Sequence, residues 1–471
     1  MGAVGYLGFE PAGSSRRLSR RGGFNGSWLV LAAIIVFFMS SLANAVERQV
    51  THAAHGHVLT NINVWSPDGR WLVYDVRSVD SVFDGTRIEQ VNVATGEVQV
   101  LYQASRGSAC GVVTYHPHQP KVVFIHGPEN PTPEWTYGAS RRRGVIVDVR
   151  QPGEARPLDA MNYAPPFTPG ALRGGSHVHV FSPDGDWVSY TYEDEVLARL
   201  GPAPAGEHEI NQRNIGVSVP AGPVRVSPTH PRNHEGDYFS VVVTRTVAAP
   251  RPGSDEISRA FEEGWIVRPN GRRALAFLGN VTATDGTVHA EVFRLELPAD
   301  LTRAGNAPLE GTATTWPAPP RGVEQRRLTF TDKRPFPGVV TTPRHWVRAS
   351  PDGTQLAFLL RDEAGVVQLG TVAPDGGPMR QVTRGNEDIA SAFTWSPDGR
   401  LIAHVRDGSV VVTDVATGRG TRLTPRHAGE DTPLPLACVF SPDGRQVAYQ
   451  RAVGDGAGRF NQVFVASVPA P

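Results

Sequence analysis

The sequence predicts an all-β protein, a closed β-propeller of seven or eight four-stranded blades. Three observations predict it: a recurring turn motif, a β-type run after each turn, and strand patterns at the two chain ends that complement each other. The motif Ser-Pro-Asp-Gly occurs at Ser66–Gly69, Ser182–Gly185, Ser350–Gly353, Ser396–Gly399 and Ser441–Gly444. The last three copies recur at intervals of 45 to 50 residues, a period typical of propeller blades.

The motif has the chemistry of a tight turn. Proline presets φ, aspartate bonds back to the backbone, and glycine takes the position with positive φ. Such a turn between two apolar runs predicts a hairpin. The run after the turn, such as Leu356–Leu360, is the second strand of a blade, and a run such as Ser409–Asp414 is the third. The fourth ends in an apolar residue followed by threonine, as in Leu328-Thr329, Val382-Thr383 and Leu423-Thr424.

Three weaker copies of the repeat raise the number of candidate blades to eight. They lie at Tyr115–Pro117, Val226–Pro228 and Arg268–Gly271, and each precedes a β-type run. Seven blades result if one weak copy is an insertion. The last unit lacks a fourth strand, and Arg48–Thr51 matches the fourth-strand pattern. We therefore expect this N-terminal segment to complete the last blade, because an open ring would leave strand edges unpaired.

The N-terminal 45 residues predict a secretory signal peptide. Two arginine pairs precede the apolar stretch Trp28–Met39, and Ala43-Asn44-Ala45 is a small-x-small cleavage site. Cleavage after Ala45 would leave residues 46–471 as a single propeller domain in the periplasm or outside the cell. The apolar stretch is short for a spanning helix, although an uncleaved anchor remains an alternative.

Charge and cysteine content exclude some classes of function. The chain has 46 basic and 46 acidic residues, and removing four Arg and one Glu with the signal peptide leaves a small acidic excess. This balance does not indicate a nucleic-acid-binding protein. Cys110 and Cys438 fall in predicted innermost strands of separated blades, so two buried thiols are favoured over a disulfide. We expect a monomer.

The repeats resemble those of the TolB protein of the Tol envelope system. A closer resemblance, to the YidR-type family of exported TolB-like proteins, rests on Gly56–Asn61, Phe124–Glu129, Gly174–His179, His230–Gly236 and Pro252–Ile257. It implies a periplasmic propeller and supplies no catalytic residue. The oligogalacturonate lyases also use TolB-like propellers, with a divalent metal held by histidines at the ring centre. His177 and His179, just before a blade turn, resemble such a placement.

One face of the ring is expected to carry the function. The turns between first and second strands are short, whereas connections on the other face are long and polar, and function concentrates in such loops. Counting five residues back from each turn places Asn61, His177, Glu263 and His345 at one level around the mouth. This count assumes that the strands have no bulges.

These mouth residues suit metal binding or acid–base chemistry. Because His177 and His345 are three blades apart, one divalent ion would need a third ligand such as His57. A polar, water-filled mouth is the alternative and is favoured. His126 and Trp135 complete the set of candidate ligand-binding residues; Trp135 would stack on a sugar or clamp a peptide, or simply pack against the rim.

Two charged segments are better explained by structural roles than by a binding or catalytic site. The run Arg141–Arg143 suits a solvated loop better than an anion site. The acidic loop Tyr192–Glu195 suits a salt-bridge partner for Arg213 or Arg245 better than a glycosidase carboxylate pair. Nucleophile-elbow, phosphate-loop and Cys-x-x-Cys motifs do not stand out.

Together these observations predict a periplasmic propeller that binds an envelope protein, a peptide or a glycan through its loop-rich face. The alternative is a metal-assisted lyase or hydrolase that acts on uronate-type oligosaccharides. No cofactor is established by the sequence, and a divalent metal belongs to the alternative only.

Overall fold

The computed structural model describes residues 47–202, 207–267, 271–436, 438–454, 456 and 458–469. They belong to one compact unit, Ala45–Pro471. The predicted signal peptide, residues 1–45, lies outside the described residues, so its cleavage stays a prediction. Within the described ranges, no helix is long and apolar enough to cross a membrane.

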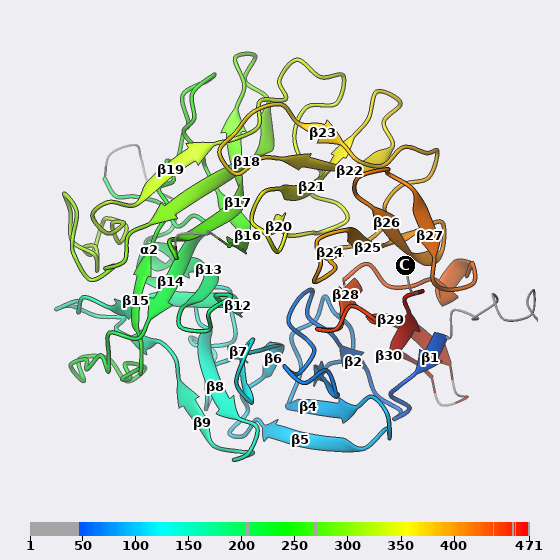
Figure 1. Cartoon of the computed structure of the whole chain (residues 1–471). Coiled ribbons are helices and arrows are strands. Elements are labelled where there is room, and N and C mark those ends of the chain that lie inside the picture. The colour runs from blue at the N-terminus through cyan, green and yellow to red at the C-terminus, as the bar shows by residue number, and fades with distance from the viewer. Residues whose placement is uncertain are drawn as a thin grey trace, which may run out of the picture. The chain divides into compact units, whose positions relative to one another are not determined.

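Seven four-stranded antiparallel sheets form the propeller, and the first strand of each blade lies nearest the ring axis (Figure 1). Blade 1 contains β2 (His57–Val58), β3 (Trp71–Val76), β4 (Arg87–Asn92) and β5 (Val98–Gln103). Blade 2 contains β6 (Cys110–Tyr115), β7 (Lys121–His126), β8 (Arg143–Asp148) and β9 (Ala155–Pro157). Blade 3 contains β12 (Gly174–Phe181), β13 (Val188–Asp194), β14 (Asn214–Val219) and β15 (Phe239–Val242). Blade 4 contains β16 (Ala260–Ile266), β17 (Arg273–Thr282), β18 (Val288–Leu297) and β19 (Glu324–Arg327).

The remaining blades follow the same order, except that the last takes its outer strand from the N-terminal end. Blade 5 contains β20 (Arg348–Ala349), β21 (Leu356–Arg361), β22 (Val367–Val372) and β23 (Arg380–Gln381). Blade 6 contains β24 (Thr394–Trp395), β25 (Leu401–Arg406), β26 (Ser409–Asp414) and β27 (Gly420–Arg422). Blade 7 contains β28 (Cys438–Phe440), β29 (Gln446–Gly454), β30 (Arg459–Ser467) and β1 (Glu47–Gln49).

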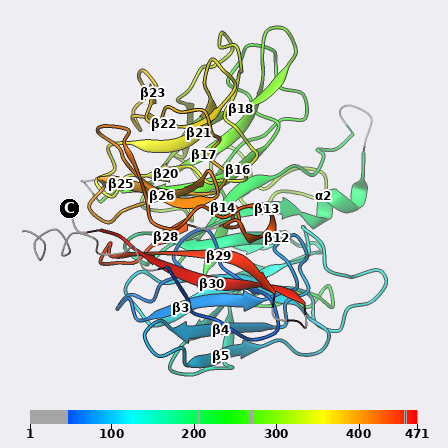
Figure 2. The same cartoon turned by 90° about the vertical axis from the view of Figure 1, so that its right-hand side faces the viewer.

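Short elements decorate this ring. A two-stranded parallel sheet joins β10 (Ala160–Met161) and β11 (Ala171–Leu172). Helix α2 (Glu195–Leu200) follows β13, and a 3-10 turn spans Gly429–Asp431. In the side view of Figure 2, α2 lies at one edge of the propeller, beyond the strands. It belongs to the connection between the second and third strands of blade 3, and therefore to the face with the long loops.

The predicted fold class is confirmed, and the described residues contain seven blades. The weak copy at Val226–Pro228 is the insertion. The run after it, expected to be a second strand, is β15, the outer strand of blade 3. The insertion instead forms isolated bridges, one within itself between Val224 and Gly236 and one to a distant residue, between His234 and Met161.

The turn chemistry explains where the second strand of these blades begins. In blade 1, the Ser66 hydroxyl donates to Asp68 Oδ1 at 2.6 Å and accepts from the Trp71 backbone N–H at 3.0 Å. Gly69 has φ of 68°, which only glycine adopts at little cost. The other four copies repeat the bond from serine to aspartate, at Ser182, Ser350, Ser396 and Ser441.

Neighbouring blades are joined by buried side chains. Indole N–H groups donate to a backbone carbonyl of the adjacent blade in three places: Trp65 to Val439 at 3.0 Å, Trp265 to Val180 at 3.0 Å, and Trp395 to Arg348 at 2.9 Å. One apolar cluster joins blades 1 and 7 through Leu59, Trp65 and Val463. In blade 7, Glu47 of β1 pairs with Ala466 of β30. Cys110 and Cys438 are free and buried.

Innermost strands of blades 2, 3 and 4 carry a β-bulge at the same height. The register shifts between Gly111 and Thr114, between His177 and Val180, and between Phe261 and Gly264. The bulged residues Val112, Val178 and Glu262 have φ of 57–59°. A bulge inserts one residue and re-aims the side chains beyond it. The assumption of strands without bulges is therefore wrong for these blades.

Candidate functional site

The long connections surround a cavity of about 650 Å³, which we call the loop-face cavity. It lies where β16 and β18 of blade 4 begin, beside the segment that leads into β20. Its charged and polar lining residues are Arg213, Arg259, Glu262, Asn280, His289, Thr341 and Arg344. Three arginines from three blades therefore converge on one space.

The three arginines differ in how they are held. Arg213 pairs with Glu193 at 2.6 Å, which agrees with the salt-bridge role expected for this acidic loop. Arg344 pairs with Glu262 at 2.7 Å. Arg259 is exposed, and within the described ranges its guanidinium has no hydrogen-bond or ion-pair partner; its backbone carbonyl accepts from the Asn280 N–H at 3.0 Å. It stacks on the Phe261 ring at 4.9 Å.

The charge of this region is reflected in two pKa values. Partial burial, and next the positive charge of Arg213, lower the pKa of Arg259. His177 is half-buried at the bulge of β12. Burial lowers the pKa of His177 well below its usual value, and Arg142, Arg344 and Arg213 lower it further. His177 is therefore neutral at pH 7, with burial as the main cause.

Arg348 and Glu263 are buried ionisable groups that do not line the loop-face cavity. Arg348 of β20 donates a hydrogen bond to the Asn61 side chain across the ring. Glu263 is 1% exposed, and neither of its carboxyl oxygens has a hydrogen-bond partner in the described structure. Burial raises the pKa of Glu263 to about 8, with the adjacent Glu262 contributing, while Arg348 acts in the opposite direction. Burial lowers the pKa of Arg348 to about 10.

The five-residue count misplaces Glu263. The register shift in β16 follows Phe261, as the shift in β12 follows His177, so Phe261 and not Glu263 occupies the position of His177. Asn61 and Glu263 nevertheless approach the same guanidinium, that of Arg348. His345 has a different role: its Nε2 accepts from the Leu359 backbone N–H at 3.1 Å, and its Nδ1 lies 3.3 Å from the Pro343 carbonyl oxygen. Both ring nitrogens of His345 are therefore engaged within blade 5.

His57, His126 and Trp135 lie elsewhere. His57 is buried, and its Nδ1 lies 3.0 Å from the Asn461 carbonyl oxygen of blade 7. The His126 ring contacts the Tyr102 hydroxyl at 2.9 Å and the Gly127 carbonyl at 2.7 Å. Trp135 is 6% exposed and covered by guanidinium groups, so its ring is no open stacking surface for a sugar.

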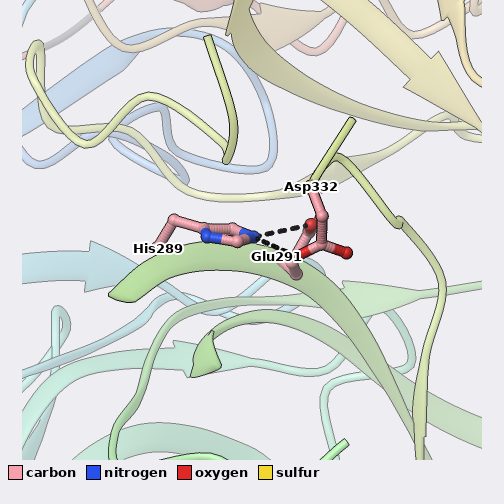
Figure 3. A group of neighbouring side chains, drawn as sticks. All are labelled: His289, Glu291 and Asp332. Atoms are coloured by element: carbon pink, nitrogen blue, oxygen red, sulfur yellow. Dashed lines mark hydrogen bonds and ion pairs between the residues drawn. The ribbon is translucent and has the colours of Figure 1, made fainter. Parts of the chain in front are cut away.

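The structure does not bring the predicted metal ligands His57, His177 and His345 together. Among the described residues, the group that could hold a metal ion is His289, Glu291 and Asp332, whose ligand atoms lie within 4.8 Å of one another (Figure 3). His289 Nε2 lies 3.2 Å from Glu291 and 3.3 Å from Asp332. Because His289 also lines the loop-face cavity, this group borders the arginine cluster.

The present partners of this group compete with a metal. Glu291 Oε1 already accepts from Arg327 at 3.0 Å and from the backbone and hydroxyl of Thr331, each at 2.7 Å. Arg327 also pairs with Asp332 at 3.3 Å. The donor types suit a divalent cation, but the Arg327 guanidinium already pairs with both carboxylates and offsets one of their two charges. The group is not evident from the sequence because a long loop separates Asp332 from the other two members; the alternation of His289 and Glu291 on one strand is the signal that could have indicated it.

Comparison with known proteins places the chain in a family. Residues 109–234 match a family model described as a protein of unknown function, DUF3748. The uncharacterized protein YidR of Escherichia coli K12 is 51% identical over 405 residues, which cover 85% of this chain and 94% of YidR. Among solved structures, an oligogalacturonate lyase in complex with manganese superposes with a TM-score of 0.52 and 12% identity, over 91% of this chain and 94% of the lyase.

A second oligogalacturonate lyase, from Vibrio parahaemolyticus, gives a TM-score of 0.53 and 11% identity over 91% of this chain and 95% of that one. At this identity the lyases support the propeller fold alone. The identity with YidR extends over nearly the whole propeller, and the chain therefore belongs to the YidR family.

Proposed function

We propose that this protein is an exported, monomeric, periplasmic propeller that binds an acidic glycan fragment in the loop-face cavity. The observation that carries the proposal is the convergence of Arg213, Arg259 and Arg344 on one space of about 650 Å³. A guanidinium recognises a carboxylate through paired N–H donors. No carboxylate lies within ion-pair distance of Arg259 among the described residues, although Glu193 and Glu262 act on its charge, so its guanidinium can still pair with a ligand carboxylate.

The rest of the lining supports a sugar acid over an acidic peptide. Asn280, Thr341 and Glu262 offer donors and acceptors for hydroxyl groups. Phe261 and Val288 supply an apolar wall for a sugar face. A volume of this size accommodates a short oligosaccharide rather than a folded partner.

The second candidate is a metal-assisted lyase or hydrolase on uronate oligosaccharides. The observation that favours it is the position of His289, which belongs both to the cavity and to the group with Glu291 and Asp332. Against it, Arg327 already pairs with both carboxylates. Binding without cleavage is therefore the better-supported function, and we assign no catalytic step to a metal.

Titration calorimetry of residues 46–471 tests the proposal, with trimers of galacturonate as the probe. Methyl-esterified trimers keep the same sugar backbone without its charge and are the ligand control. Arg259→Ala and Arg344→Ala should each weaken binding by about 10- to 100-fold, because a hydrogen bond to a charged group contributes about 1.5–3 kcal/mol. Arg445→Ala, a highly exposed arginine in a turn on the opposite face, should change nothing.

Three results would decide between the candidates. Equal binding of charged and esterified trimers, or none of either, would refute the acidic-glycan proposal. Unsaturated products that form only with added Mn²⁺, and that Asp332→Asn abolishes, would establish the lyase instead. Binding without product formation, lost in Arg259→Ala, would support the binding propeller.

A further inference from the structure

A second cavity, of about 240 Å³, lies between blade 2 and the insertion of blade 3. We call it the arginine pocket. It shares no lining residue with the loop-face cavity. All its lining residues fall between His126 and His234, inside the segment that matches the family model. Four of them are arginines: Arg141, Arg142, Arg143 and Arg232.

Two of these arginines have carboxylate partners. Arg141 pairs with Glu195 at 2.9 Å. Arg143 pairs with Glu129 at 3.3 Å, and Glu129 is shared with the exposed Arg106 at 3.1 Å. These two acidic groups therefore already serve other arginines and leave little negative charge for the rest of the pocket.

Arg142 and Arg232 have no carboxylate within ion-pair distance in the described structure. Arg142 is 7% exposed, its Nε has no hydrogen-bond partner, and its Nη1 donates a 3.3 Å hydrogen bond to the Tyr137 hydroxyl. The nearby Glu193 is committed to Arg213. A buried guanidinium without its hydrogen bonds is costly, which indicates that something supplies them. The sequence-based expectation of a solvated loop is wrong for Arg142.

The pocket is held in place before any ligand arrives. Two backbone carbonyls fix Arg232, those of Glu129 at 2.5 Å and Asn130 at 2.9 Å. Trp135 forms a wall against which Arg232 stacks, with 5.8 Å from its guanidinium carbon to the ring centre. Because these groups are already ordered, binding would cost little side-chain entropy.

We infer that the arginine pocket binds a phosphate group, either free inorganic phosphate or the phosphate of a small ester. Arg142 and Arg232 have no carboxylate ion-pair partner, and their two positive charges match a phosphate dianion. Arg232 keeps N–H donors beyond the two that its backbone partners take, and these match phosphate oxygens. The volume admits a phosphate and a few further atoms but no long chain. The buried Nε atoms of Arg142 and Arg143 are donors without an acceptor, and a phosphate oxygen is a strong acceptor.

Calorimetry with inorganic phosphate and with a hexose phosphate, at constant ionic strength, tests this inference in residues 46–471. Wild type should bind one equivalent, and Arg142→Ala and Arg232→Ala should each weaken binding by at least about tenfold. Tighter binding of the ester would identify an organic phosphate, and equal or weaker binding would identify the free ion. Arg259→Ala, in the other cavity, should bind phosphate as wild type does.

Arg232→Lys separates a loss of binding from a loss of folding, because lysine keeps the positive charge but lacks the paired N–H donors of the guanidinium. It should fold, as judged by circular dichroism, and still lose most of the phosphate affinity. Wild type that does not bind phosphate above a chloride control would overturn the inference. So would Arg142→Ala and Arg232→Ala variants that fold and bind phosphate as wild type does.

Discussion

Glu263→Gln should make the protein more stable, and the gain should grow with pH. Burial raises the pKa of Glu263 from 4.5 to about 8. The folded state therefore holds a proton that the unfolded state releases above pH 4.5. The contribution of protonated Glu263 to the free energy of unfolding is fully present below pH 4.5. It is lost as the pH rises and has reached its minimum above about pH 8.

The size of the effect follows from the same two values. At about 1.4 kcal/mol per pH unit between 4.5 and about 8, ionisation of Glu263 costs roughly 5 kcal/mol at pH 9 as an upper value. Glutamine has nearly the same shape and cannot ionise. Glu263→Gln should therefore match wild type within about 1 kcal/mol at pH 5 and exceed it by about 3–5 kcal/mol at pH 9.

Urea unfolding followed by tryptophan fluorescence, at pH 5, 7 and 9, measures this difference. Comparing the two proteins at each pH cancels every other titrating group. Glu262→Gln is the matched control, since it removes the 2.7 Å ion pair with Arg344 and should lower stability by up to about 1 kcal/mol. A Glu263→Gln difference that stays constant from pH 5 to pH 9, or becomes negative at pH 9, would refute the reasoning.

Two further predictions concern the contacts between blades. Trp395→Phe removes the 2.9 Å hydrogen bond to the Arg348 carbonyl and should lower the free energy of unfolding by about 1–3 kcal/mol; an unchanged urea midpoint would contradict this. Gly264→Ala places a methyl carbon 2.1 Å from the Val347 carbonyl oxygen and should abolish soluble folded protein. Gly138→Ala meets no atom within 4 Å and should stay within about 0.5 kcal/mol of wild type, so equal yields of the two variants would count against the packing argument.

The blades could be predicted because their turns are local. Ser66, Asp68 and Gly69 make their hydrogen bonds within six residues, so the motif alone determines the geometry of the turn. The weak copy at Val226 wrongly predicted an eighth blade, because its Ser-Pro pair occurs in an insertion. The strand after it, β15, is the outer strand of blade 3. Local sequence does not say which sheet a strand joins.

The candidate site could be predicted only in part, since its geometry depends on bulges and on distant residues. Glu262 has positive φ although it is not glycine, and nothing in the sequence around it signals the bulge. Arg213, Arg259 and Arg344 are far apart in the chain and converge only when three blades are assembled. Arg142 looked like part of a solvated run because its burial arises from residues outside that run.

The pairing of β1 with β30 has a consequence for how the chain is made. Ala466 follows Glu47 by 419 residues in the chain, so the outer strand of blade 7 has no partner until most of the propeller has been synthesised. Contacts of such large sequence separation form slowly. An unfinished ring with unpaired strand edges is prone to association with other chains. The pairing of β1 with β30 therefore covers a strand edge that would otherwise be open to such association.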